Sequence, residues 1–129
     1  MTGHWFQLAP LVALLHISGD MVVNVCPAAV TSASPDRVWT VLTTPERFDE
    51  WVDGAFVSAE PPGPVKPGQV IRFAARGFGR RWSVLIDVVN VDPQRGWIDF
   101  LVHLPLGVKN HEHVTLTETK EGRTLVRFN

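Results

Sequence analysis

Apolar and polar residues alternate along most of the second half of the chain, which is the pattern of half-buried β-strands. The alternation predicts strands over residues 69–76, 81–91, 97–104, 111–119 and 123–128. Two earlier segments, 21–31 and 55–60, have the same character, and turns rich in Gly and Pro separate the segments. Long consecutive strands joined by short turns predict one antiparallel sheet that curls around its apolar face.

Residues 34–51 break this alternation and predict two short helices. Ser34 is a good N-cap before Pro35, and Thr44-Pro45-Glu46 repeats these start signals ten residues later, so the first helix must end near Thr43. Helices this short are not stable alone in water, so both must pack on the sheet. Their apolar side chains are Val38, Leu42, Phe48 and Trp51, with Trp39 and Val41 beside them.

The apolar sides of the predicted strands would converge on a single hollow. The residues expected to point into it are Ile71, Phe73, Trp82, Val84, Ile86, Phe100, Val102, Val114 and Leu116. A deep apolar pocket with few polar groups selects its ligand by shape and by the apolar area that it buries. We therefore expect these nine residues to bind a hydrophobic small molecule.

Glu112 is the one candidate for a catalytic role. It falls in register with Val114 and Leu116, which places it at the mouth of the expected hollow. A carboxyl there would be partly desolvated, with a raised pKa, and could carry a proton. The alternative is that Glu112 lies near a strand end and simply reaches water.

The histidines suggest two further sites, and we favour neither. His111 and His113 are two apart on a predicted strand, so both could bind one metal ion, but their positions fit the outer face of the sheet. Asp99 and His103 also share a face and could form an acid–base pair. They alternate with the apolar set, so we expect them to face solvent, and we predict no metal and no cofactor.

Composition narrows the class of protein. A chain of 129 residues with 45% hydrophobic residues is long enough for one domain with a real core. A net charge of −1 gives no electrostatic footprint for nucleic acid or an anionic membrane. The single cysteine, Cys26, excludes an internal disulfide and suits a reducing, cytoplasmic compartment.

Residues 1–20 form an apolar leader that does not fit the strand pattern, so we divide the chain into this leader and a domain over 21–129. The leader is too short to span a bilayer and lacks the basic start of a signal peptide. Met21 stands directly before the first strand, which suggests that the natural protein starts there. The alternative is that residues 4–17 form a packing helix.

A strand, two short helices and a run of strands resemble the SRPBCC or START-like superfamily, also called the helix-grip or Bet v 1-like fold. The polyketide cyclase/dehydrase and coenzyme Q-binding branch is the most similar. The likeness covers 21–129 and is carried by residues 33–42 and 45–51, Pro67-Gly68, Val91-Asp92-Pro93 and Gly122-Arg123-Thr124. It implies an α+β fold in which a curved antiparallel sheet of six or seven strands grips the helices.

In this superfamily a long C-terminal helix normally roofs the cavity, and here the sequence stops at Asn129 without one. A broad apolar groove would then face water, which a soluble monomer rarely tolerates. Three interpretations stay open: a homodimer that covers the groove, residues 4–17 in place of the missing helix, or a truncated product.

The resemblance and the scarcity of inward polar residues favour a non-catalytic carrier of a lipid, quinone, isoprenoid or polyketide-like compound. A polyketide cyclase or dehydratase that uses an acid–base residue of the cavity is the first alternative, and a truncated member without a ligand is the second. The number of ionisable groups in the cavity separates the first two. None or one favours the carrier, whereas a convergent pair, such as Glu112 with a histidine, favours the enzyme.

Overall fold

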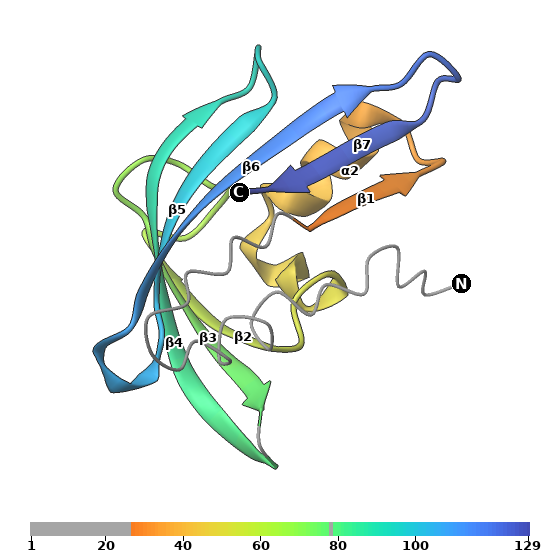
Figure 1. Ribbon diagram of the computed structural model, residues 1–129. Coiled ribbons are helices and arrows are strands. Elements are labelled where there is room, and N and C mark those ends of the chain that lie inside the picture. The colour runs from red at the N-terminus through yellow and green to blue at the C-terminus, as the bar shows by residue number, and fades with distance from the viewer. Residues whose placement is uncertain (1–26, 78) are drawn as a thin grey trace.

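A computed structural model of the chain describes residues 27–77 and 79–129. They form one seven-stranded antiparallel sheet that curls around two short helices (Figure 1). The strands are β1 (Ala28–Thr31), β2 (Gly54–Glu60), β3 (Val70–Gly77), β4 (Arg80–Asp92), β5 (Trp97–His103), β6 (Lys109–Glu118) and β7 (Thr124–Phe128). The α+β class, the strand number and the curved sheet predicted from the sequence are therefore confirmed.

The sheet is a meander to which the first strand adds one edge. Its order is β1-β7-β6-β5-β4-β3-β2, so each strand from β2 to β7 lies beside the next one in sequence, and β1 pairs with β7. The first strand was expected over 21–31, and the structure has it at Ala28–Thr31; residues 21–26 and the leader 1–20 lie outside the described residues. In the described part of the chain no helix follows β7.

The helix α2 (Pro35–Leu42) follows β1 and has the start predicted for it. Ser34 caps it, because its Oγ accepts a hydrogen bond from the Arg37 N–H at 3.3 Å. The helix stops at Leu42, as expected from the next Pro, and the Thr43 N–H still donates to the Trp39 carbonyl at 2.9 Å. No helix within residues 27–77 or 79–129 is long and apolar enough to cross a membrane.

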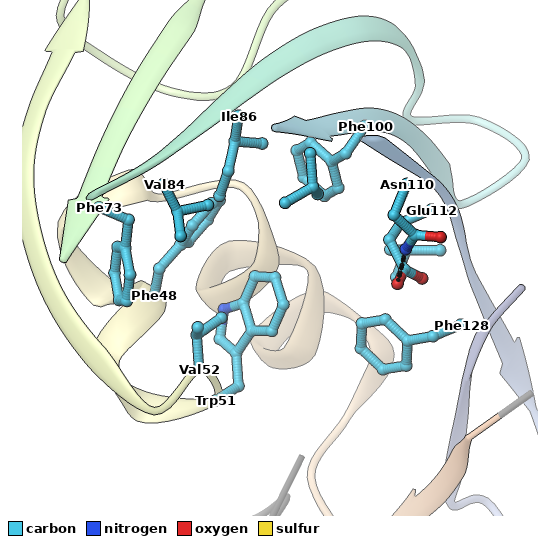
Figure 2. Close-up of a pocket in the computed structure, with 12 residues that line it drawn as sticks. Phe48, Trp51, Val52, Phe73, Val84, Ile86, Phe100, Asn110, Glu112 and Phe128 are labelled. Atoms are coloured by element: carbon cyan, nitrogen blue, oxygen red, sulfur yellow. Dashed lines mark hydrogen bonds between the residues drawn. The ribbon is translucent and has the colours of Figure 1, made fainter. Parts of the chain in front are cut away.

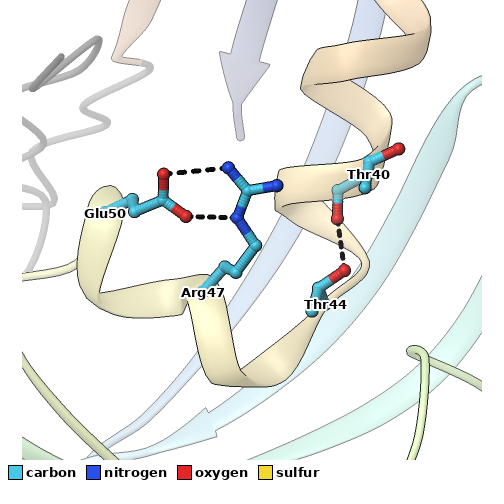
Figure 3. Close-up of polar contacts among 4 residues, drawn as sticks. All are labelled: Thr40, Thr44, Arg47 and Glu50. Atoms are coloured by element: carbon cyan, nitrogen blue, oxygen red, sulfur yellow. Dashed lines mark hydrogen bonds and ion pairs between the residues drawn. The ribbon is translucent and has the colours of Figure 1, made fainter. Parts of the chain in front are cut away.

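The second helix, η1 (Pro45–Glu50), is a 3₁₀ helix whose start differs from the expected cap. The Thr44 hydroxyl does not cap it but donates back to the Thr40 carbonyl at 2.6 Å (Figure 3). Within η1, Arg47 forms a two-bond ion pair with Glu50, and this pairing lowers the pKa of the Glu50 carboxyl. Both side chains are more than a third exposed, so the pair stabilises the turn only slightly.

The core lies between these helices and the concave face of the sheet. Phe48 of η1 is fully buried, with its ring centroid 4.7 Å from that of Trp51 and 6.0 Å from that of Phe100 on β5. The inward positions of β3, β4 and β5 are buried as the alternation predicted. They include Ile71, Phe73, Val84, Ile86, Val88, Ile98, Phe100 and Val102.

Two bulges bend the sheet around this core. The pairing register shifts between Phe56 and Ser58 on β2 and between Val88 and Asn90 on β4. Each shift leaves the intervening valine about half exposed or more, at 60% for Val57 and 49% for Val89. A bulge adds a residue to one strand only and increases local bend and twist, so both contribute to the curvature that creates a concave face. A short 3₁₀ turn, η2 (Pro105–Gly107), then joins β5 to β6.

The close pairing of β2 with β3 requires glycine at position 54. A Cβ atom on Gly54 would lie 2.3 Å from the Ala74 carbonyl oxygen and 2.9 Å from the Ala75 Cα. We expect Gly54→Ala to lower the free energy of unfolding by about 3 kcal/mol or more, because backbone on the neighbouring strand must move. Urea unfolding followed by circular dichroism measures the change.

The matched control is Gly77→Ala at the end of β3. A Cβ there would meet only the Trp82 ring at 3.8 Å, an ordinary contact, so the change should stay within about 0.5 kcal/mol. Equal unfolding midpoints for the two variants would contradict the close approach at position 54.

Candidate functional site

A hollow lies between the concave face of the sheet and the end of η1 (Figure 2). Ten of the twelve lining residues are apolar or aromatic, and each of these ten is at most 9% exposed. The lining residues are Phe48, Trp51, Val52, Phe73, Val84, Ile86, Phe100, Val102, Asn110, Glu112, Val114 and Phe128. The wall can therefore bind apolar groups, and only two of its residues, Asn110 and Glu112, are polar.

The cavity is narrow. The space that the centre of a water molecule can occupy is about 50 Å³, whereas all atom-free space, counted out to the open mouth, is about 580 Å³. The larger volume includes open solvent at the mouth, so the enclosed interior is close to 50 Å³. A space of that size holds only a few water molecules. Sites for drug-sized ligands are typically about 300–1,000 Å³, so a ligand with several rings would need side chains to move.

Trp51 lies in the cavity wall, and its polar group has no partner in the part of the chain that the structure describes. It follows η1 directly, in a non-helical conformation, and its ring packs between Phe48 and Phe128 at centroid distances of 4.7 and 5.8 Å. Its indole N–H is buried and has no acceptor among the described residues. A buried donor without a partner costs about 1–3 kcal/mol, so this inward position is less stable than its apolar contacts alone suggest.

Glu112 and Asn110 form the polar part of the wall, and both come from β6 (Figure 2). The Asn110 Nδ2 donates a hydrogen bond to Glu112 Oε1 at 2.5 Å. Burial raises the pKa of the Glu112 carboxyl, and the hydrogen bond from Asn110 opposes this only in part. Glu112 therefore lies in a cavity that disfavours its charge.

Six of the nine residues expected to point into the hollow do line it. They are Phe73, Val84, Ile86, Phe100, Val102 and Val114, and Glu112 lies beside them as its register with Val114 indicated. Alternation along each strand was sufficient to identify this face, because side chains two residues apart lie on the same side of a sheet.

Ile71, Trp82 and Leu116 do not line this cavity. Ile71 is fully buried in the core. Trp82 lies near the β3–β4 turn, where its indole N–H donates to the Gly77 carbonyl at 2.9 Å and its ring lies under the Arg80 guanidinium at 4.5 Å. Leu116 lines a second hollow beside α2. All three are on the predicted side of their strands, but alternation does not specify how far along a strand the cavity extends.

Five lining residues were not predicted: Phe48, Trp51, Val52, Asn110 and Phe128. The sequence indicates helix-to-sheet packing for Phe48 and Trp51, and the structure shows that the same side chains also form the cavity wall. Asn110 carried a usable signal in the sequence, whereas Phe128 is brought to the cavity by strand register. Asn110 is two residues before Glu112 on one strand, and Phe128 pairs with Val114 across β6 and β7.

His103 and His113 lie on the other side of the sheet from Glu112, where each makes a cross-strand pair. His103 donates from Nε2 to Asp87 on β4 at 2.7 Å, and His113 donates from Nδ1 to Asp99 on β5. The suggested pair of Asp99 with His103 is therefore not formed, because each residue bonds to a neighbouring strand. His111 is exposed, and the described residues contain no group of three acidic, histidine or cysteine side chains placed to hold a metal ion.

The second hollow is wider but much more open. It lies between α2 and the turn after β4, is lined by Trp39, Leu116 and residues 93–96 among others, and offers about 330 Å³ to the centres of water molecules. Its rim carries the charged side chains of Asp36, Arg95 and Glu118. Three of its nine lining residues are charged, so it offers an apolar ligand less than the cavity of Figure 2.

The raised pKa of Glu112 predicts a pH-dependent effect of Glu112→Gln on stability. Folding disfavours the charged carboxyl, so its contribution to stability is fully favourable below the pKa of the unfolded chain, near 4.5. That contribution is lost as the pH rises through the higher pKa of the folded state. Glu112→Gln stays neutral, so it should match the native protein near pH 4 and be more stable at pH 8, by urea unfolding.

Glu118→Gln, on the exposed end of the same strand, controls for the removal of one negative charge. A pH-independent difference between Glu112→Gln and the native chain would show that position 112 does not disfavour a charge.

Comparison with known proteins agrees with this geometry. A family model described as "Polyketide cyclase / dehydrase and lipid transport" matches residues 27–129. The comparison with curated proteins yields no match. Among solved structures, a Rhodobacter sphaeroides protein is 19% identical, with a TM-score of 0.59 over 80% of this chain and 70% of its own.

Two further solved structures have the same fold. DynU16, from the dynemicin biosynthetic locus, is 25% identical with a TM-score of 0.60, over 81% of this chain and 36% of its own. Ara h 8.0201 is 18% identical with a TM-score of 0.54, over 81% of this chain and 76% of its own. The curved sheet, the two short helices and the family match lead to one conclusion: the chain belongs to the polyketide cyclase/dehydrase and lipid transport family.

Proposed function

We propose that this chain binds a hydrophobic small molecule, such as a lipid, quinone, isoprenoid or polyketide-like compound, in the cavity of Figure 2. The observation that carries the proposal is the wall itself: ten apolar residues from the η1 region and five strands surround one hollow that opens to the surface. An aromatic group buries about 150–250 Å². At about 25 cal/mol per Å², this contributes roughly 4–6 kcal/mol before the costs of binding.

Ligand entry requires the cavity to widen, and Trp51 is the side chain that we expect to give way. When the indole turns toward the mouth, its N–H regains water as a partner, and this offsets part of the cost of separating the ring from Phe48 and Phe128. The apolar body of the ligand would then take the place of the Trp51 ring in the cavity.

A polyketide cyclase or dehydratase is the second candidate function. Glu112 supports it, because a carboxyl with a raised pKa is suited to proton transfer. An enzyme of this kind is better served by two convergent acid–base groups, and Glu112 is the single ionisable residue among those that line the cavity. The binding function is therefore the better supported of the two.

Filling the cavity should abolish binding. Val84 lines the wall from β4, and Val84→Phe would place a ring in the space that the ligand needs. We expect the affinity for the apolar fluorescent probe N-phenyl-1-naphthylamine to fall at least tenfold, as measured by the rise of its fluorescence on titration.

Val89→Phe is the matched control. It makes the same change on the same strand, but Val89 points outward at the β4 bulge and is 49% exposed. The control should bind the probe like the native protein. Equal loss in both variants would place the probe outside the cavity, and no binding by the native chain would favour a family member without a ligand.

Truncating the Trp51 side chain should have the opposite effect on the affinity for the probe. Trp51→Leu removes the indole ring and its unpaired N–H, so the cavity widens without a new polar group. We expect tighter binding of N-phenyl-1-naphthylamine. The variant should also lose stability, but by less than the roughly 3–5 kcal/mol that truncation of a buried tryptophan to alanine typically costs. The measurements are the same titration and urea unfolding; weaker binding would show that Trp51 holds the probe instead of blocking it.

A further inference from the structure

The two polar residues of the cavity wall lie next to each other on its otherwise apolar surface. Asn110 and Glu112 are two apart on β6, so their side chains share the concave face, and Figure 2 shows both pointing into the space above Phe128. The Trp51 indole nitrogen is drawn on the side of its ring opposite to Glu112. The two polar residues of the described wall therefore lie together at one end of the cavity, apart from the indole N–H of Trp51.

The hydrogen bond between these two residues leaves one oxygen of Glu112 unused. Asn110 Nδ2 donates to Oε1 at 2.5 Å, whereas Oε2 accepts no hydrogen bond from a described residue. The amide therefore orients the carboxyl without adding a charge to it. What remains is a fixed oxygen at the polar end of the cavity.

The surroundings of Glu112 favour its neutral form once a ligand is bound. The lining residues from the η1 region and from β3, β4, β5 and β7 include no titratable group, and Phe100 lies directly across from Glu112 on β5. An apolar body in the cavity would remove the remaining water, which penalises a carboxylate far more than a carboxylic acid. A neutral acid can accept from Asn110 through one oxygen and donate through the other.

We propose that Glu112 recognises a carbonyl oxygen on an otherwise apolar ligand by donating it a hydrogen bond from its carboxyl. This inference rests on the binding function proposed above and adds a requirement on the chemistry of the ligand. A pure hydrocarbon would leave the buried O–H unpaired, whereas a ketone or quinone oxygen satisfies it. Binding of the carbonyl compound then retains the proton on Glu112 and weakens as the pH rises.

The test compares two ligands of nearly equal shape, 2-acetylnaphthalene and 2-isopropylnaphthalene, by displacement of N-phenyl-1-naphthylamine. We compare the ratio of ketone affinity to hydrocarbon affinity at pH 5. In the native protein this ratio should be about five times the ratio in Glu112→Leu, which is the factor expected for one net hydrogen bond. Both affinities should fall between pH 5 and pH 8, because either ligand desolvates the Glu112 carboxyl, and the ketone affinity should fall further, because it also loses the donated hydrogen bond.

Glu112→Gln gives a sharper prediction, because its amide donates at every pH. It should keep the ketone preference and lose the pH dependence. Glu118→Leu, on the same strand outside this cavity, is the control and should behave like the native protein.

The outcomes separate the two proposals. If both naphthalenes bind but their ratio is the same in the native protein and Glu112→Leu, the cavity binds apolar compounds and the carbonyl inference is wrong. A ketone affinity that rises with pH would also overturn it. If neither compound binds, the proposed function fails and the inference fails with it.

Discussion

The packing of Phe48 into the concave face of the sheet is the contact on which the rest of this structure depends. Helices α2 and η1 span eight and six residues, too few to be stable in water without a surface to cover them. Phe48 provides that contact, since it is fully buried and meets Phe100 on β5 in an edge-to-face arrangement. Val38, Val41 and Leu42 extend the same contact along α2.

The same packing of aromatic side chains limits the volume of the cavity. Phe48 and Trp51 anchor the helical segment, and they also line the space in which a ligand would lie. The protein therefore has one apolar interior that serves as core and as site. Because its aromatic rings pack against one another, the free space is about 50 Å³, and any larger ligand must compete with side chains that stabilise the fold. In the proposed function, ligand entry and stability would be coupled through Trp51 above all.

Much of this arrangement could be predicted from the sequence, for reasons that also explain the errors. Alternation defines the face of a strand, so Phe73, Val84 and Phe100 were correctly expected to point inward. It carries no information on position along the strand, so Trp82 was expected in a cavity that does not reach the β3–β4 turn.

Contacts between strands were harder to predict than the face of the sheet on which a side chain lies. The pairs of Asp87 with His103 and of Asp99 with His113 depend on strand register, which the sequence of one strand does not contain. Phe128 was missed for the same reason, because it reaches the cavity only through its pairing with Val114. Trp51 was missed because its position after a short helix predicts packing on the sheet, and in this small interior a packing side chain also lines the cavity.

Two glutamates show how the surroundings decide what a carboxyl can do here. Glu50 is more than a third exposed, and the hydrogen bonds and the charge of Arg47 lower the pKa of its carboxyl, so it stays ionised and stabilises a turn. Glu112 is more deeply placed, and its partner Asn110 donates a hydrogen bond but brings no positive charge. A leucine at position 112 would fill the same wall without burying a carboxyl. Because apolar packing alone would favour a hydrocarbon side chain at position 112, a carboxyl at this place is consistent with the proposed interaction with a ligand.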